Sequence, residues 1–159
     1  MEPTSSPTRP EISSTQILPQ LLMRRPTLAH LPALNLPGDL TFRWYRAGDD
    51  AHWDHIIGST FGWNPAAGAF EREMRSDKDF FAEDHVGFIC VNDQPVATAS
   101  AWCRPNLFGP STGVLHWVGT LATHQGRGLG GLVSLACLHR MANDDGRTNA
   151  VLRRSEEHT

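Results

Sequence analysis

A cluster of glycines is the feature of this chain with the clearest capacity for chemistry. Gly126, Gly128, Gly130 and Gly131 fall within six residues, directly before an apolar stretch with helical spacing. Without side chains at a helix start, free backbone N–H groups and the positive end of the helix dipole can approach a phosphate closely. A glycine-rich turn that only permits tight packing is the alternative. So many glycines weaken a helix start, which favours an anion-binding loop.

Two phosphate-binding motifs overlap in this loop. Residues 126–131, GRGLGG, satisfy the dinucleotide fingerprint GxGxxG. That fingerprint normally opens a βαβ unit with further strands, yet 28 residues follow Gly131 and the next apolar segment runs into Arg153 instead of an acid for a ribose hydroxyl. The sequence contains no GK[ST], so a Walker loop is excluded. A fragment of a dinucleotide-binding oxidoreductase stays as the less favoured alternative.

The pattern of apolar residues predicts the elements that position this loop. Alternation predicts strands, and apolar residues three or four apart predict helices. Residues 113–123 form a long uncharged run, typical of a central strand covered on both faces. The predicted order is strand 40–46, helix 51–61, short helix 66–75, hairpin strands 86–91 and 95–102, strand 113–123, glycine loop, helix 132–144 and a strand from Asn149.

Shifted by one residue, the glycine loop reads Gln125-x-x-Gly128-x-Gly130, which resembles the [QR]xxGx[GA] loop of the GNAT superfamily of acyl-CoA-dependent N-acyltransferases. The predicted order of elements is also similar to that of the family, over about residues 40–153. The resemblance implies an α/β (α+β) fold with a mixed central sheet flanked by helices. It also implies that the chain stops in or after the fifth strand of that fold.

The resemblance assigns a binding role to two stretches of the chain. The backbone of Val118, Gly119 and Thr120 is expected to pair with the pantetheine arm of acetyl-CoA, the acyl donor. The pyrophosphate is expected to lie on Gln125, Gly126, Arg127, Gly128, Leu129, Gly130 and Gly131. Arg127 either adds a charge-assisted contact or faces solvent and contributes its N–H alone.

His116 is the candidate catalytic base, because an amine must lose a proton as it attacks a thioester. Regular alternation predicts that His116 faces the same way as Val118 and Thr120. Relatives often carry a charged group nine or eleven residues before the Gln125 position, and the eleventh is Val114 here. A buried, purely structural His116 is the alternative. His124, next to the loop, is interpreted as a surface or capping residue.

Two features bear on the acceptor. Residues 49–84 contain nine acids and three bases, which indicates either a solvated helix face or an acidic rim that attracts a cationic amine. Phe61 and Trp63 fall between the two early helices, where relatives of the family build the acceptor pocket, although aromatic residues are more often core. The expected acceptor is a small-molecule or peptide amine.

Composition limits the classes of partner. The net charge is −3 and Lys and Arg are not clustered, so nucleic-acid binding is not expected. The lack of a long apolar run argues against a membrane span, and the first ten residues lack an export signal, which makes the cytoplasm the expected location. Cys90, Cys103 and Cys137 form no CxxC pair, which predicts packed thiols and no metal site.

The chain divides into four predicted regions. Residues 1–15 are expected to be a disordered tail, 16–39 a Pro-rich extended arm, and 40–153 an incomplete N-acetyltransferase domain. Residues 154–159, RSEEHT, resemble translated sequencing adapter, so the strand is expected to end near Arg153 with an open sheet edge beside it. The predicted function is acyl transfer to a primary amine. A non-catalytic CoA-sensing module is the alternative.

Overall fold

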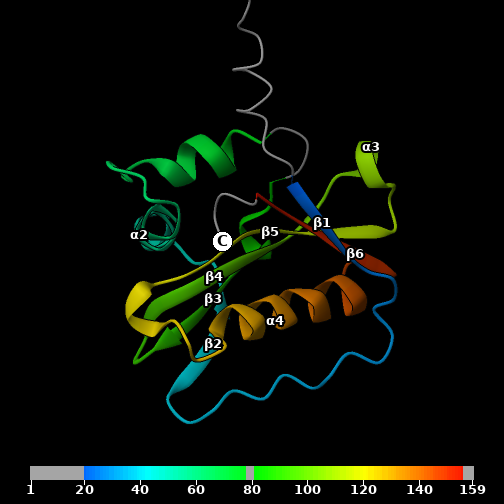
Figure 1. The fold of residues 1–159 in the computed structure, drawn as a ribbon, viewed down its shortest axis with the longest axis horizontal. Coiled ribbons are helices and arrows are strands. Elements are labelled where there is room, and N and C mark those ends of the chain that lie inside the picture. Colours follow the sequence, from blue (N-terminus) through cyan, green and yellow to red (C-terminus); the bar gives the residue numbers. More distant parts are fainter. Residues whose placement is uncertain (1–19, 78–80, 156–159) are drawn as a thin grey trace, which may run out of the picture.

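The computed structural model describes the backbone of residues 20–77 and 81–155, which form a six-stranded sheet (Figure 1). The strand order is β1-β6-β5-β4-β3-β2. Every neighbouring pair is antiparallel except β5 with β6, which is parallel. The strands are β1 (Gln20–Arg25), β2 (Leu40–Trp44), β3 (Val86–Val91), β4 (Gln94–Cys103), β5 (Thr112–Thr120) and β6 (Asn149–Ser155). The mixed sheet confirms the predicted fold class.

Two long helices cover opposite faces of the sheet. Helix α4 (Leu129–Asn143) packs on one face and α2 (Asp49–Phe61) on the other, as Figure 1 shows. Each face has its own apolar core, which we name after its helix: the α4 core and the α2 core. Four single turns complete the described part: η1 (Glu71–Arg75), η2 (Glu83–His85), α3 (Pro105–Phe108) and η3 (Ala122–His124).

Local sequence explains most of the element boundaries. Gly48 and Gly62 flank α2 with φ of 97° and 71°, a backbone conformation that side chains disfavour. Asn92 and Asp93 form the hairpin turn with φ of 50° and 66°, as expected for the tight turn between β3 and β4. The predicted helix at 66–75 is shortened to the π-helical turn η1, and α4 begins three residues earlier than predicted, at Leu129.

The N-terminal part of the described chain returns to the far edge of the sheet. β1 pairs antiparallel with β6 from Gln20↔Ser155 to Arg25↔Ala150, so the expected open edge beside β6 is wrong. The following residues run along α4, as the blue-to-cyan trace in Figure 1 shows. Leu28 is buried there, and its N–H donates to the Thr148 carbonyl over 2.8 Å.

Both ends of the chain include residues outside the described ranges. The predicted disordered tail at 1–15 lies outside the described residues, as do residues 156–159. β6 runs two residues past the predicted end at Arg153, because Arg154 and Ser155 continue the ladder with β1. No helix within the described ranges is long and apolar enough to span a membrane.

Candidate active site

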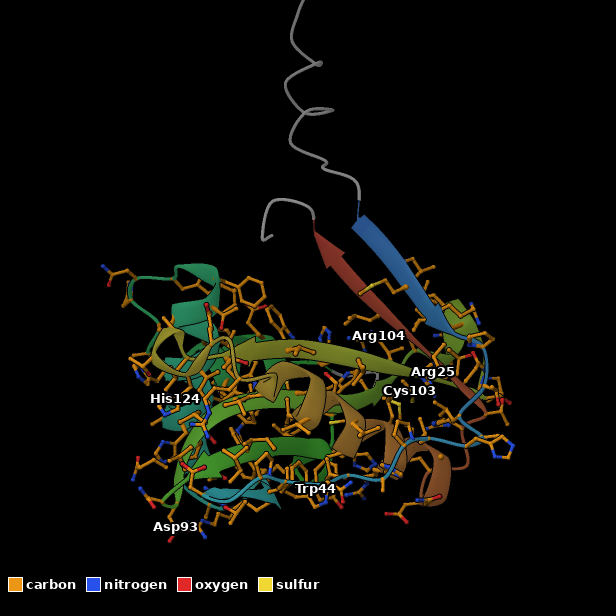
Figure 2. All side chains as sticks on the ribbon, turned by 60° about the horizontal axis from the view of Figure 1, so that its bottom comes forward. Arg25, Trp44, Asp93, Cys103, Arg104 and His124 are labelled. Atoms are coloured by element: carbon orange, nitrogen blue, oxygen red, sulfur yellow. The ribbon has the colours of Figure 1, made fainter. Side chains whose placement is uncertain are left out.

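The two parallel strands separate at the centre of the sheet. β5 and β6 pair from Thr112↔Asn149 to Leu115↔Leu152, and beyond Leu152 β6 pairs with β1 alone among the described strands. Figure 2 shows β1 and β6 leaving the plane of the other strands together. From His116 to Thr120, no strand in the described ranges pairs with the side of β5 that faced β6. Such an edge can take up an extended ligand through backbone hydrogen bonds.

A bulge interrupts β5 where this free edge begins. Thr98 pairs with Gly119 and Ser100 with His116, so Trp117 and Val118 together lie opposite a single residue of β4. Trp117 has a φ of 53°, which is unusual for a bulky side chain. The bulge places the side chains of two successive residues, His116 and Trp117, on the same face of the sheet.

This bulge overturns one prediction about His116. The His116 ring lies 5.7 Å from that of Trp102 and 5.2 Å from that of Trp117, and both tryptophans belong to the α2 core. Val118 and Thr120 instead face α4, because a Cβ added at Gly130 would lie 3.7 Å from Thr120 Oγ1 and 3.9 Å from Val118 Cγ1. His116 therefore faces away from Val118 and Thr120, because one extra residue reverses the alternation of side chains.

The glycine loop leaves the start of α4 open. Gly126 and Gly128 have φ of 86° and 74°, and a Cβ at either position, or at Gly131, meets no atom within 4 Å. Within the described residues, no side chain caps α4 and its first turn carries no acid. The first N–H groups of the helix thus keep their capacity to bind an anion.

The side chains around the loop have defined partners. Arg127 forms an ion pair of 3.0 Å with Asp39, and both side chains are largely exposed. The Gln125 amide donates to the Thr120 carbonyl over 3.2 Å, which ties the loop to the end of β5. His124 contacts the Thr123 hydroxyl and lies at the end of the sheet opposite Arg104 (Figure 2). His124 is thus a surface residue next to the loop, as predicted.

Aromatic rings surround His116 on the α2 face. Trp117 is the centre of the group, and its ring centroid lies 5.5 to 5.7 Å from those of Trp53, Phe61 and Trp63. Trp53 is fully buried, whereas Phe61 and Trp63 are partly exposed. The imidazole of His116 therefore lies next to an apolar cluster of rings that is partly exposed.

The acidic segment is mostly neutralised by local partners. Arg75 alone bonds to Asp50 and Glu83 and also forms an ion pair with Glu71. Asp54 accepts from the N–H groups of residues 68 and 70. Other pairs in the same segment are Arg43–Asp49, Arg104–Asp77 and Arg140–Asp84. These carboxylates anchor turns and helices, which favours the interpretation as ordinary surface over an acidic rim for a cationic acceptor.

Tyr45 and the cysteines do not reach the free edge of β5. The Tyr45 hydroxyl donates to Asp50 and accepts from Arg75, and burial, followed by the bond to Asp50, raises the pKa of Tyr45 to about 12. The three cysteines are buried and unbridged, as predicted, and burial raises the pKa of the Cys137 thiol. In the described ranges, no three His, Cys, Asp or Glu side chains are grouped to hold a metal.

The sequence-based reasoning missed two residues of this site. The bulge at Trp117 carries no local signal, because tryptophan is common in regular strands. Ser100 lies on the α2 face directly opposite His116, and its place depends on the pairing of β4 with β5. Alternation along 95–102 could have put Ser100 on one face with Trp102, but not beside His116.

Together, the mixed sheet that opens between β5 and β6 and the uncapped, glycine-rich start of α4 define the class of this protein as α/β with a mixed central sheet. Residues 44–155 match the family model of the acetyltransferase (GNAT) family. The chain belongs to this family, which uses acetyl-CoA. Membership excludes the dinucleotide-binding alternative, which would need a mostly parallel sheet, whereas β5 with β6 is the one parallel pair among the described strands.

The chain is similar in sequence or in fold to several acetyltransferases. The mycothiol acetyltransferase of Mycobacteroides abscessus is 32% identical over 131 residues, covering 79% of this chain and 44% of that protein. The chain thus spans less than half the length of this curated relative. A GCN5-related N-acetyltransferase from Sphaerobacter thermophilus superposes with a TM-score of 0.63 at 16% identity, covering 92% of this chain and 47% of that one. A GNAT family acetyltransferase from Brucella melitensis, solved in complex with acetyl-CoA, gives 0.51 at 19% identity, covering 65% and 68%.

Proposed function

We propose that the protein transfers an acetyl group from acetyl-CoA to a primary amine by direct attack. The observation that carries this proposal is the open, glycine-lined start of α4 beside the unpaired edge of β5. One feature suits a pyrophosphate and the other an extended arm, and a coenzyme A molecule has both. When bound, acetyl-CoA supplies the acetyl group as a thioester.

Two stretches of backbone hold this donor in the proposal. The free edge of Val118, Gly119 and Thr120 pairs with the pantetheine arm as an added strand would. The N–H groups of Gln125–Gly131 surround the pyrophosphate. Arg127 belongs to the same loop and pairs with Asp39. Its guanidinium adds a cationic contact to the pyrophosphate in this proposal.

His116 is the proposed base, and it works from the α2 face. The acceptor amine then enters among the rings of Phe61, Trp63 and Trp117, which exclude water. The amine nitrogen bonds to the acetyl carbon, and the thiolate of CoA leaves as the bond between carbon and sulfur breaks. The imidazole takes the proton that the amine loses. The mycothiol acetyltransferase relatives favour a small-molecule acceptor over a peptide.

Ligand-dependent melting tests the cofactor site. Acetyl-CoA at 100 times its Kd should stabilise the chain by about 2.7 kcal/mol, a shift of several degrees in Tm. NAD and ATP should give no comparable shift. Equal shifts with all three ligands would contradict the proposal. Binding without thiol release over a broad panel of amines would instead indicate a CoA sensor.

A matched pair of glycine variants separates phosphate binding by the glycine loop from the effect of backbone strain. Gly128 and Gly146 flank α4 with φ of 74° and 73°, and at both a Cβ meets only open space. Gly128→Ala and Gly146→Ala should therefore cost similar stability, roughly 1 kcal/mol. Only Gly128→Ala should weaken the acetyl-CoA shift in Tm. A similar loss of the acetyl-CoA shift in both variants would contradict the assignment of the glycine loop to the pyrophosphate.

Replacement of His116 tests the base. His116→Ala should lower kcat at neutral pH by about 100-fold, the lower end of general-base effects, with little change in acetyl-CoA affinity. The thiol released per minute and the Tm shift with acetyl-CoA measure the two quantities separately. If kcat and its pH profile stay the same, His116 has a structural role only.

A further inference from the structure

A buried hydroxyl lies beside the proposed base. The Ser100 side chain is 0% exposed, and its Oγ has no hydrogen-bond partner among the described residues. A buried hydroxyl without a partner costs about 1–3 kcal/mol, and folded proteins keep few of them. Thr98, two residues earlier on β4 and equally buried, has such a partner, since its Oγ1 donates to the Gly87 carbonyl over 2.8 Å. Ser100 is therefore the hydroxyl of this strand that calls for a role.

The strand register shows what Ser100 faces. It lies opposite Val86 on β3 and opposite His116 on β5. Its neighbours Ala99 and Ala101 belong to the α4 core and Trp102 to the α2 core, so Ser100 points to the α2 face. His116 faces the same way. Directly opposite residues on one face of an antiparallel pair have Cβ atoms about 4.5–5.5 Å apart.

The bulge gives this pairing its significance. Ser100↔His116 is the last regular pair before the ladder shifts, so the bulge does not displace it. Trp102 and Trp117 flank the imidazole with centroid distances of 5.7 and 5.2 Å. Rings can limit the movement of an imidazole, but a hydrogen-bond partner decides which nitrogen carries the proton. Across the strand pair, the Ser100 hydroxyl is the buried polar group directly opposite this imidazole.

We propose that Ser100 is a positioning residue for His116. This inference rests on the proposed function, in which His116 takes the amine proton. Because Ser100 Oγ has no hydrogen-bond partner in the described part of the chain as the side chains stand, the proposed contact of one imidazole nitrogen with Ser100 Oγ forms when the Ser100 side chain rotates toward the imidazole or when one water molecule bridges the two groups. The other nitrogen then carries the lone pair that accepts the proton of the amine. Ser100 transfers no proton to the substrate, and it acts only through the tautomer and orientation of His116.

The test compares Ser100→Ala with Thr98→Val in the full chain. Thr98→Val removes a hydroxyl from the same strand and face, but one that is bonded to backbone. Nitrogen-15 spectra of the histidine ring, assigned with His116→Ala, report on the tautomer without need of activity. Ser100→Ala should change the His116 ring signals and lower kcat about tenfold, with KM for acetyl-CoA and the unfolding midpoint unchanged or the midpoint raised. Thr98→Val should lower the unfolding midpoint and leave ring signals and kcat as they are.

The double variant gives an independent measure of the coupling. If Ser100 acts through His116, Ser100→Ala should have no further effect on kcat in a His116→Ala background. Ring signals that stay the same in Ser100→Ala, or that change equally in Thr98→Val, would overturn the inference. If the wild-type chain transfers no acetyl group but the ring signals respond as expected, the contact stands and the proposed function fails.

Discussion

Asp49 begins α2 from an almost buried position, with 3% of its side chain exposed. Arg43 on β2 donates to both of its carboxylate oxygens, over 2.6 and 3.0 Å, and the Arg46 N–H donates over 2.8 Å. Burial by itself would raise the pKa of Asp49, but the hydrogen bond from Arg43 and the further bond from Arg46 lower it below the usual value. This ion pair therefore fixes the start of α2 against β2.

The depressed pKa predicts how stability depends on pH at this residue. A carboxyl whose pKa is lower in the folded state stabilises above its unfolded pKa, about 3.9, and loses that effect as pH falls through the folded pKa. Asp49→Asn should lower the free energy of unfolding at pH 7 by about 3 kcal/mol. Denaturant titrations of both chains should show the difference shrinking below about pH 4.

Asp93 provides the control for this measurement. It is exposed in the hairpin turn with φ of 66°, which asparagine tolerates. Asp93→Asn should change the free energy of unfolding by less than about 0.5 kcal/mol. If Asp49→Asn keeps its full effect at pH 2, the ion pair is not the source of the stabilisation.

At the scale of elements, the contact between β5 and α2 decides the geometry of the site. After the bulge, Gly119 faces α2, where an added Cβ would lie 2.6 Å from Thr60 Oγ1 and 3.0 Å from Ile57 Cδ1. The helix can pack this closely against the strand because residue 119 has no side chain. Among the described strands, β5 therefore has an unpaired backbone edge at residues 118–120, and it packs directly against α2.

This close approach predicts a strong effect of one methyl group. Gly119→Ala should lower the free energy of unfolding by about 1–3 kcal/mol, because α2 or its side chains must move away from β5. Gly131→Ala is the matched change, since its Cβ meets open space in the first turn of α4. It should leave stability unchanged or raise it by about 0.5–1 kcal/mol. Equal thermal stability of the two variants would rule out this packing.

At the scale of the whole molecule, the N-terminal segment completes the sheet. β1 pairs with residues 150–155 of β6, and the residues after β1 lie along α4, where the Pro32 carbonyl contacts His139 Nε2 at 2.7 Å. β1 becomes the edge strand, and Leu22 and Met23 are among its exposed side chains. β1 thus covers the edge of β6 that faces away from β5, which would otherwise be a long unpaired edge.

Truncation tests the role of β1. Removal of residues 1–25 should uncover the edge of β6, so the shortened chain should associate at lower concentration than the full chain. Removal of residues 1–19 leaves β1 in place and should not change the association. Sedimentation velocity over a range of concentrations measures both. Identical behaviour of the two shortened chains would show that β1 does not protect this edge.

The glycine loop and the order of elements could be predicted because their signals are local. Gln125, Gly128 and Gly130 lie within six residues, and their backbone needs are met by the loop and helix that contain them. The hairpin turn at Asn92 and Asp93 is predictable for the same reason, since these residue types tolerate positive φ. The sequence by itself therefore determined the family, the place of the glycine loop before α4 and the two helix-covered faces of the sheet.

The facing of His116 and the partner of β6 were decided only by the tertiary structure. One extra residue in β5 reverses the alternation beyond it, and this bulge exists only relative to β4. In the same way, β1 finds β6 across more than a hundred residues of chain, and no local pattern encodes that pairing. Side-chain direction in a strand depends on register, and register is a property of two strands, which a single run of residues cannot fix.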